Sequence, residues 1–230
     1  MRLHFPDPAQ HGPGPWPAIF EQRYGNDGTD DATRADLTEL AGGGFVVGLL
    51  MFRGAWQSEG EWVSYRALGW GENMDDNVYA DGYDCCEWLA AQPWCTGKIG
   101  SFGSSQAGFA QNFLAVMRPP SLVCQYMIDT GLSLYHEAYR MGGCWGQHTS
   151  VNARPAIGTD GIGRGTYGKD HSVMTQREWA DHMEHCDDYW LAEDCTRYIN
   201  RMDVPCCTIG SWYDFGSGLG VNAIVNGFIG

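Results

Sequence analysis

The residues that could perform chemistry gather in one stretch, residues 99–108. A candidate strand ends there at Gly103, and Ser105 follows after one intervening residue. A helix then begins with the small residues Ala107 and Gly108. A reversal from strand to helix within three residues strains the backbone at the serine, and small neighbours let strand and helix approach closely. The hydroxyl is then held clear of the sheet, so the pattern indicates Ser105 as a nucleophile.

The residue after Ser105 would supply a second part of such a site. The backbone N–H of Gln106 lies at the positive end of the following helix, where it can donate to an oxyanion. The pattern G-x-S-x-G is incomplete, because Ala107 stands at its second glycine and Gly108 comes one residue later. An ordinary turn with a serine N-cap therefore fits these residues equally well.

The elements that must position Ser105 alternate between strand and helix. This alternation is typical of a doubly wound, mostly parallel α/β sheet, in which functional groups lie at the carboxyl ends of the strands. Apolar runs predict the strands and amphipathic spacing predicts the helices. The expected strands are residues 18–20, 45–52, 98–103, 122–128 and 204–210, and the expected helices are residues 30–41, 73–91, 106–117 and 175–200.

One domain accounts for the whole chain of 230 residues. A chain of this length buries roughly 70% of its unfolded surface without needing a metal or disulfides. We expect a core of residues 17–141 and 201–230, with residues 142–200 as a reduced cap insertion. Residues 1–16 are rich in proline and glycine and are expected to form an irregular lead-in.

Charge and cysteine usage narrow the classes of partner and compartment. The formal net charge of −14 repels phosphate backbones and anionic lipids, so we expect neither nucleic acid nor a membrane as partner. The nine cysteines include adjacent pairs and no C-x-x-C spacing, so they predict reduced thiols in a cytoplasmic protein. Apolar neighbours predict that Cys124 and Cys206 behave as small hydrophobes.

Four motifs follow one another along the chain. They are Glu21-Gln22-Arg23-Tyr24, Arg53-Gly54-x-x-x-Ser58-Glu59-Gly60, residues 88–100 leading into Gly103-x-Ser105-x-x-Gly108, and Val204-Pro205-x-x-x-x-Gly210-x-Trp212-Tyr213-Asp214. Together they resemble the CocE/NonD hydrolases. These are serine hydrolases of the α/β-hydrolase fold, grouped with cocaine esterase, α-amino-acid ester hydrolases and X-prolyl dipeptidyl peptidases. The resemblance covers residues 17–140 and 186–215.

The resemblance implies an α/β-hydrolase fold and cleavage of an ester or amide through an acyl-enzyme on Ser105. It implies Asp214 as the acid that orients a catalytic histidine, and the Tyr24 hydroxyl with the Gln106 N–H as the oxyanion hole. The position of Asp214 in the sequence agrees with this role. It follows a predicted strand, where α/β sheets place their functional groups, and it comes after the serine in the chain, which is the order that this fold uses. The substrate would be a small ester or amide, and no cofactor is expected.

The chain also departs from the family pattern. None of the residues after Asp214 is a histidine, and neither the full cap nor a C-terminal jelly-roll domain is recognisable. Gln106 replaces a tyrosine, and Arg23 stands where a proline precedes Tyr24. Without a histidine after Asp214, we expect impaired activity of this chain. Because triads are defined by geometry rather than chain order, the alternative is an upstream histidine in that role. The candidates are His136, His148, His171, His182 and His185.

Two alternatives to an active serine hydrolase follow. The first is a catalytically inactive, truncated or redesigned scaffold or binding protein, for which exposed apolar surface would favour a homo-oligomer. The second is metal-dependent hydrolysis. We expect no metal site, because the adjacent acidic pairs face apart on a helix and lack a histidine at ligand spacing. These pairs are Asp75–Asp76, Asp187–Asp188 and Glu193–Asp194.

Overall fold

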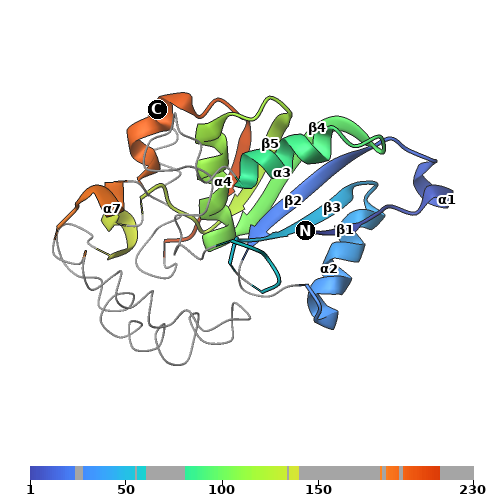
Figure 1. Cartoon of the computed structure of the whole chain (residues 1–230), viewed down its shortest axis with the longest axis horizontal. Coiled ribbons are helices and arrows are strands. Elements are labelled where there is room, and N and C mark those ends of the chain that lie inside the picture. Colours follow the sequence, from blue (N-terminus) through green and yellow to red (C-terminus); the bar gives the residue numbers. More distant parts are fainter. Residues whose placement is uncertain are drawn as a thin grey trace.

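A six-stranded sheet runs through the computed structural model (Figure 1). The strand order is β1-β3-β2-β4-β5-β6, and every neighbouring pair is parallel except β1 with β3. The strands are β1 (Arg2–His4), β2 (Trp16–Arg23), β3 (Val46–Met51), β4 (Cys95–Ser104), β5 (Leu122–Ile128) and β6 (Cys206–Ile209). The structure describes residues 1–23, 28–54, 56–60, 81–133, 135–139, 182, 185–191 and 194–212.

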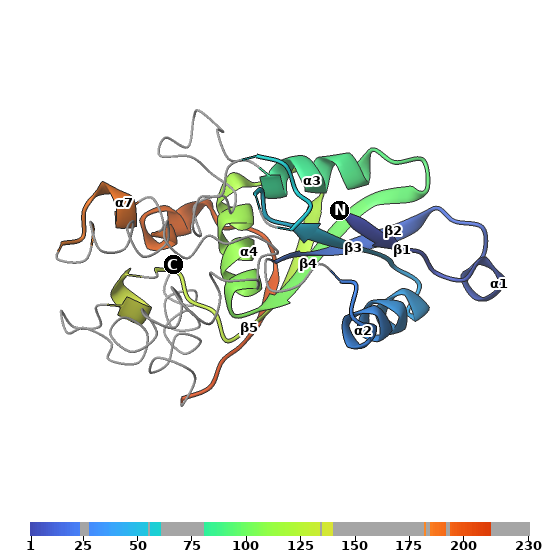
Figure 2. The same ribbon diagram turned by 60° about the horizontal axis from the view of Figure 1, so that its bottom comes forward.

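Helices lie on both faces of this sheet. Figure 2 shows α3 and α4 on one face and α2 on the other. The helices are α1 (Pro8–His11), α2 (Asp31–Gly42), α3 (Asp81–Ala90), α4 (Gln106–Met117) and α7 (Asp188–Leu191), with a π-helical turn at Tyr135–Tyr139 and a 3₁₀ helix at Cys195–Arg201. This arrangement confirms the predicted doubly wound α/β sheet.

The strand β3 shows why the sequence folds into this core. Val46, Val47 and Leu49 are fully buried, because α2 covers one face of β3 and the layer that contains α3 covers the other. The side chain of Asp30 caps α2 by accepting a hydrogen bond of 2.9 Å from the Thr33 N–H. The expected helix at 30–41 and strand at 45–52 are both confirmed.

A buried polar network fixes α4 against β4 and β5. The Ser101 hydroxyl donates to Gln111 Oε1 at 2.7 Å, and Gln125 Nε2 donates to Ser101 Oγ at 3.2 Å and to the Gln111 carbonyl at 2.8 Å. Gln111 Nε2 in turn donates to the Tyr126 carbonyl at 3.1 Å. Sliding α4 along the sheet would leave these buried groups unpaired, so the network sets the position of the helix.

Three sequence-based expectations need correction. The lead-in contains a strand and a helical turn, since β1 pairs with β3 and Asp7 caps α1. Both elements are too short for a hydrophobic period to reveal them. Cys124 and Cys206 are exposed, because their side chains lie outside the packed layers. The described part of residues 175–200 contains only short helices, and Asp194 starts a new one by accepting from the Thr196 N–H.

The remaining expectations concern the bounds of one helix, the division of the chain into core and cap, and membrane-spanning helices. The helix α3 lies within the helix expected at 73–91, whose earlier part falls outside the described residues. The division into a core and a cap at 142–200 stays a prediction. Within the described ranges, no helix combines the length and apolar character needed to cross a membrane.

The buried carboxyl group of Glu21 predicts a pH-dependent stability. Glu21 is 5% exposed, and its Oε2 lies 2.7 Å from Nη2 of Arg23. Burial raises the pKa of Glu21 more than the Arg23 charge lowers it. Because the pKa is higher in the folded state, the charged carboxylate costs stability at neutral pH, and this cost disappears as the pH falls through the folded-state pKa.

We therefore expect Glu21→Gln to raise the free energy of unfolding at pH 7, with the gain vanishing below about pH 4. Urea unfolding at several pH values measures this difference. Glu39→Gln removes the same charge from an exposed position of α2 and serves as the control. A Glu21→Gln protein less stable than the parent chain at pH 7 would show that the ion pair outweighs the burial.

Candidate active site

Ser105 occupies a sharp turn between β4 and α4, with φ 53° and ψ −119°. A positive φ is strained for a residue with a side chain. The Ser105 N–H donates to the Ile128 carbonyl at 2.8 Å, and the Ser105 carbonyl accepts from the Phe109 N–H at 2.9 Å. The side chain is exposed and makes no capping hydrogen bond. This conformation differs from an ordinary serine N-cap, whose hydroxyl accepts from the first turn of its helix.

Two glycines make this turn possible. Gly103 has φ 155°, and a Cβ there would lie 2.7 Å from the Ala107 Cβ. A Cβ on Gly108 would lie 2.8 Å from the Cβ of Thr130, a residue in the segment that follows β5. Contacts this short do not occur between real carbon atoms, so both positions require glycine. The second glycine falls at 108 because the segment after β5 approaches the helix at that residue.

Gln106 is the first residue of α4, so its N–H belongs to the group of first-turn donors that have no partner within the helix. The helix dipole adds positive potential at this end. The side-chain Nε2 of Gln106 is also buried and has no hydrogen-bond partner among the described residues. The N–H groups at the start of α4 suit the stabilisation of an oxyanion beside Ser105.

Sequence reasoning missed one residue at this edge of the sheet, Asp129. It follows β5 directly and has φ 46°. Its N–H donates to the Ile209 carbonyl at 2.8 Å, and its Oδ1 accepts from the Ser211 N–H at 3.1 Å. An acidic residue immediately after an apolar strand was the available signal in the sequence.

The structure does not test the roles predicted for the other site residues. Tyr24 and Asp214 lie outside the described residues, as do His148 and His171. The strand β2 ends at Arg23, which pairs with Met51 of β3, and its Phe20 pairs with Ser101 of β4. The roles of Tyr24 and Asp214 therefore stay predictions.

Two of the described candidate histidines lie beside carboxylates. Nδ1 of His182 lies 2.5 Å from Oδ2 of Asp187, and its ring stacks on Tyr189 with centroids 4.4 Å apart. Nε2 of His136 lies 3.9 Å from Oδ2 of Asp194, and His185 is exposed. Among the described residues, none of these three histidines forms a hydrogen bond with Ser105. Nor does the described part of the chain contain three His, Cys, Asp or Glu side chains arranged to hold a metal ion.

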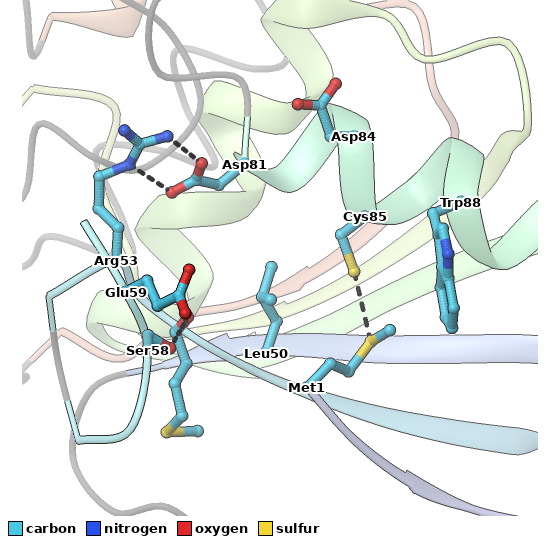
Figure 3. A pocket seen from close by; sticks show the side chains of 10 residues that line it. Met1, Leu50, Arg53, Ser58, Glu59, Asp81, Asp84, Cys85 and Trp88 are labelled. Carbon is cyan, nitrogen blue, oxygen red and sulfur yellow. Dashed lines mark hydrogen bonds and ion pairs between the residues drawn. The ribbon is translucent and has the colours of Figure 1, made fainter.

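The motif that begins at Arg53 builds a loop that is held to the start of α3. Arg53 Nε donates to Asp81 Oδ2 at 2.8 Å, and Nη2 of the same guanidinium pairs with Asp81 Oδ1 (Figure 3). The Ser58 hydroxyl donates to the Met51 carbonyl at 3.2 Å, and the Gly54 N–H donates to the Glu59 carbonyl at 2.9 Å. These bonds close the loop and attach it to the start of α3.

The same loop borders an open hollow of about 410 Å³ between the end of β3 and α3. Figure 3 shows the Cys85 thiol against the Met1 sulfur, 3.5 Å away, at one side of this hollow. Ser105 does not line it. The lining residues are Met1, Leu50, Met51, Arg53, Ser58, Glu59, Asp81, Asp84, Cys85 and Trp88.

A strained serine at the carboxyl end of a central parallel strand, followed at once by a helix, is typical of the α/β-hydrolase fold. The sequence profile of the X-Pro dipeptidyl-peptidase (S15) family matches residues 1–224. The chain therefore belongs to that family, and the predicted relation to the CocE/NonD hydrolases is confirmed.

Comparison with known proteins agrees with this assignment. A CocE/NonD family hydrolase from Staphylococcus aureus superposes with a TM-score of 0.71 at 20% identity, covering 94% of this chain and 39% of the other. An α-amino acid ester hydrolase superposes with a TM-score of 0.66 at 17% identity, covering 90% and 39%. Cocaine esterase from Rhodococcus sp. (strain MB1 Bresler) is 36% identical over 73 residues, which are 32% of this chain and 11% of that protein. The chain thus spans well under half the length of these relatives.

The contact between Gly108 and Thr130 predicts the cost of a single methyl group. We expect Gly108→Ala to lower the free energy of unfolding by about 1–3 kcal/mol, because the added Cβ overpacks the junction of α4 and the segment after β5. Gly42→Ala, at the end of α2, meets no atom within 4 Å and serves as the control. It should be neutral or stabilise by about 0.5–1 kcal/mol. Equal urea midpoints for the two variants would contradict the packing described for the turn.

Proposed function

We propose that this chain carries the nucleophile of a serine hydrolase that cleaves ester or amide bonds through an acyl-enzyme on Ser105. The observation that carries the proposal is the positive φ of Ser105, with its hydroxyl exposed and free of a capping bond at the start of α4. A strain of about 1–3 kcal/mol persists at such a residue only where the surroundings enforce it. Membership of a hydrolase family supports the same conclusion.

In the proposed reaction, Oγ of Ser105 bonds to the carbonyl carbon of the substrate while its proton passes to a general base. The N–H of Gln106 and the hydroxyl of Tyr24 stabilise the oxyanion that forms. Collapse of this intermediate breaks the bond to the alcohol or amine, which leaves with the proton from the base. Water then attacks the acyl-enzyme by the same route and frees Ser105.

The base is an imidazole oriented by Asp214. His182 and His136 lie beside the carboxylates of Asp187 and Asp194, so His148, His171 and His185 are the first candidates within this chain. Serine acyl transfer needs no cofactor. The relatives' names refer to an ester, an amino-acid ester and a dipeptidyl peptidase, and a small ester or amide is the substrate class common to them.

A second candidate is a scaffold of the same fold without catalysis. The observation that favours it is the lack of any hydrogen bond from a described histidine to Ser105. Without an imidazole to accept the proton, the serine hydroxyl is a poor nucleophile at neutral pH. The two candidates differ in whether hydrolysis depends on Ser105.

Hydrolysis of p-nitrophenyl acetate distinguishes them. Ser105→Ala should lower kcat by about 10³-fold or to the level of the uncatalysed reaction, because the acyl-enzyme can no longer form. Ser104→Ala removes the hydroxyl of another exposed serine one residue earlier and should leave kcat within about threefold. Equal residual rates for the parent chain and Ser105→Ala would instead support the scaffold.

A further inference from the structure

Residue 129 lies where three chain segments meet at the carboxyl edge of the sheet. Strand β5 lies between β4 and β6 (Figure 1), and Ile128 is paired with Ser104 on one side and with Ile209 on the other. Its carbonyl accepts the Ser105 N–H at 2.8 Å. The next residue, Asp129, donates its N–H to the Ile209 carbonyl at 2.8 Å. Ile128, the last residue of β5, and Asp129, which follows it, therefore hold the proposed nucleophile and the end of β6.

The side chain of Asp129 replaces a backbone group in this ladder. The hydrogen bonds between β5 and β6 start where the Gln125 N–H donates to the Pro205 carbonyl. At the other end, the Asp129 N–H donates to the Ile209 carbonyl. The next bond of a parallel ladder would run from the Ser211 N–H to the carbonyl of residue 129. Instead, the Ser211 N–H donates to Oδ1 of Asp129 at 3.1 Å.

The reason for this replacement lies in the backbone of Asp129. With φ 46°, the chain turns out of the strand at this residue. The turn brings Thr130 against Gly108 of α4, and the Gly131 carbonyl accepts from Asn112 Nδ2 at 2.6 Å. Aspartate and asparagine combine a tolerance for positive φ with a short side-chain acceptor. Asp129 therefore lets the backbone turn toward α4 while its carboxylate continues the ladder to β6.

We infer that Asp129 is a positioning residue that sets the segment beginning at Ser211 relative to Ser105. This inference rests on the proposed function, because Ser211 comes three residues before Asp214, the proposed acid. One oxygen of Asp129 fixes the start of that segment, and the carbonyl of the preceding residue fixes the nucleophile. A shift of either segment would change the distance between the acid and the serine.

Three variants separate the acceptor from the backbone conformation. Asp129→Asn keeps both an acceptor and the tolerance for positive φ. Asp129→Gly keeps the conformation but removes the acceptor, and Asp129→Ala removes both. The hydrogen bond is followed through the amide proton of Ser211, by its chemical shift and its exchange rate in NMR spectra. Turnover is followed with p-nitrophenyl acetate.

We expect Asp129→Asn to keep the Ser211 amide protected from exchange and to leave kcat within about threefold of the parent chain. In Asp129→Gly the Ser211 amide should lose this protection, and kcat should fall about tenfold or more at a similar KM. Unchanged amide exchange in Asp129→Gly would overturn the inference even if the chain proves inactive, because exchange does not depend on catalysis. Loss of all activity in Asp129→Asn would also overturn it, by assigning Asp129 itself as the acid. Failure of the proposed function is seen separately, as equal rates for the parent chain and Ser105→Ala.

Discussion

The positive φ of Ser105 depends on contacts from both sides of the turn. On the strand side, the Ile128 carbonyl holds the serine N–H, and on the helix side the Phe109 N–H holds its carbonyl. A left-handed residue costs about 1–3 kcal/mol, which these bonds and the close packing at Gly103 and Gly108 offset. The hydroxyl is thereby presented outward at the start of a helix. The exposed serine and the first N–H groups of α4 take their positions from this turn.

The surrounding structure keeps α4 and its neighbours from relaxing. The side-chain amides of Gln111 and Gln125 form buried hydrogen bonds with the Ser101 hydroxyl. These bonds fix the position of α4 along β4 and β5. At the neighbouring strand ends, the Arg53–Asp81 pair holds the loop after β3 to the start of α3. Apolar packing gives this layer its stability, and the polar contacts give it one geometry. Such rigidity is what a preorganised catalytic edge requires.

The sequence predicts the parts of the fold that local patterns determine. The strand at 45–52 and the helix at 106–117 were predictable because their apolar spacing is continuous, and the turn at Ser105 because small residues surround it. The strand at Arg2–His4 was not, since its pairing with β3 gives it structure that three residues cannot encode. Asp129 was missed because its role arises from β6, about eighty residues later. Cys124 shows the same limit. Its apolar neighbours in sequence do not reveal which face of β5 other elements cover, and Cys124 is exposed.

The central claim is that Ser105 is a strained, outward-facing nucleophile beside the N–H of Gln106. A crystal structure of the chain after treatment with a fluorophosphonate tests it directly. We predict a phosphonyl group on Oγ of Ser105, a positive φ at that residue, and a phosphonyl oxygen about 3 Å from the Gln106 nitrogen. An unmodified Ser105 with a right-handed helical φ, or an adduct on another residue, would contradict the account.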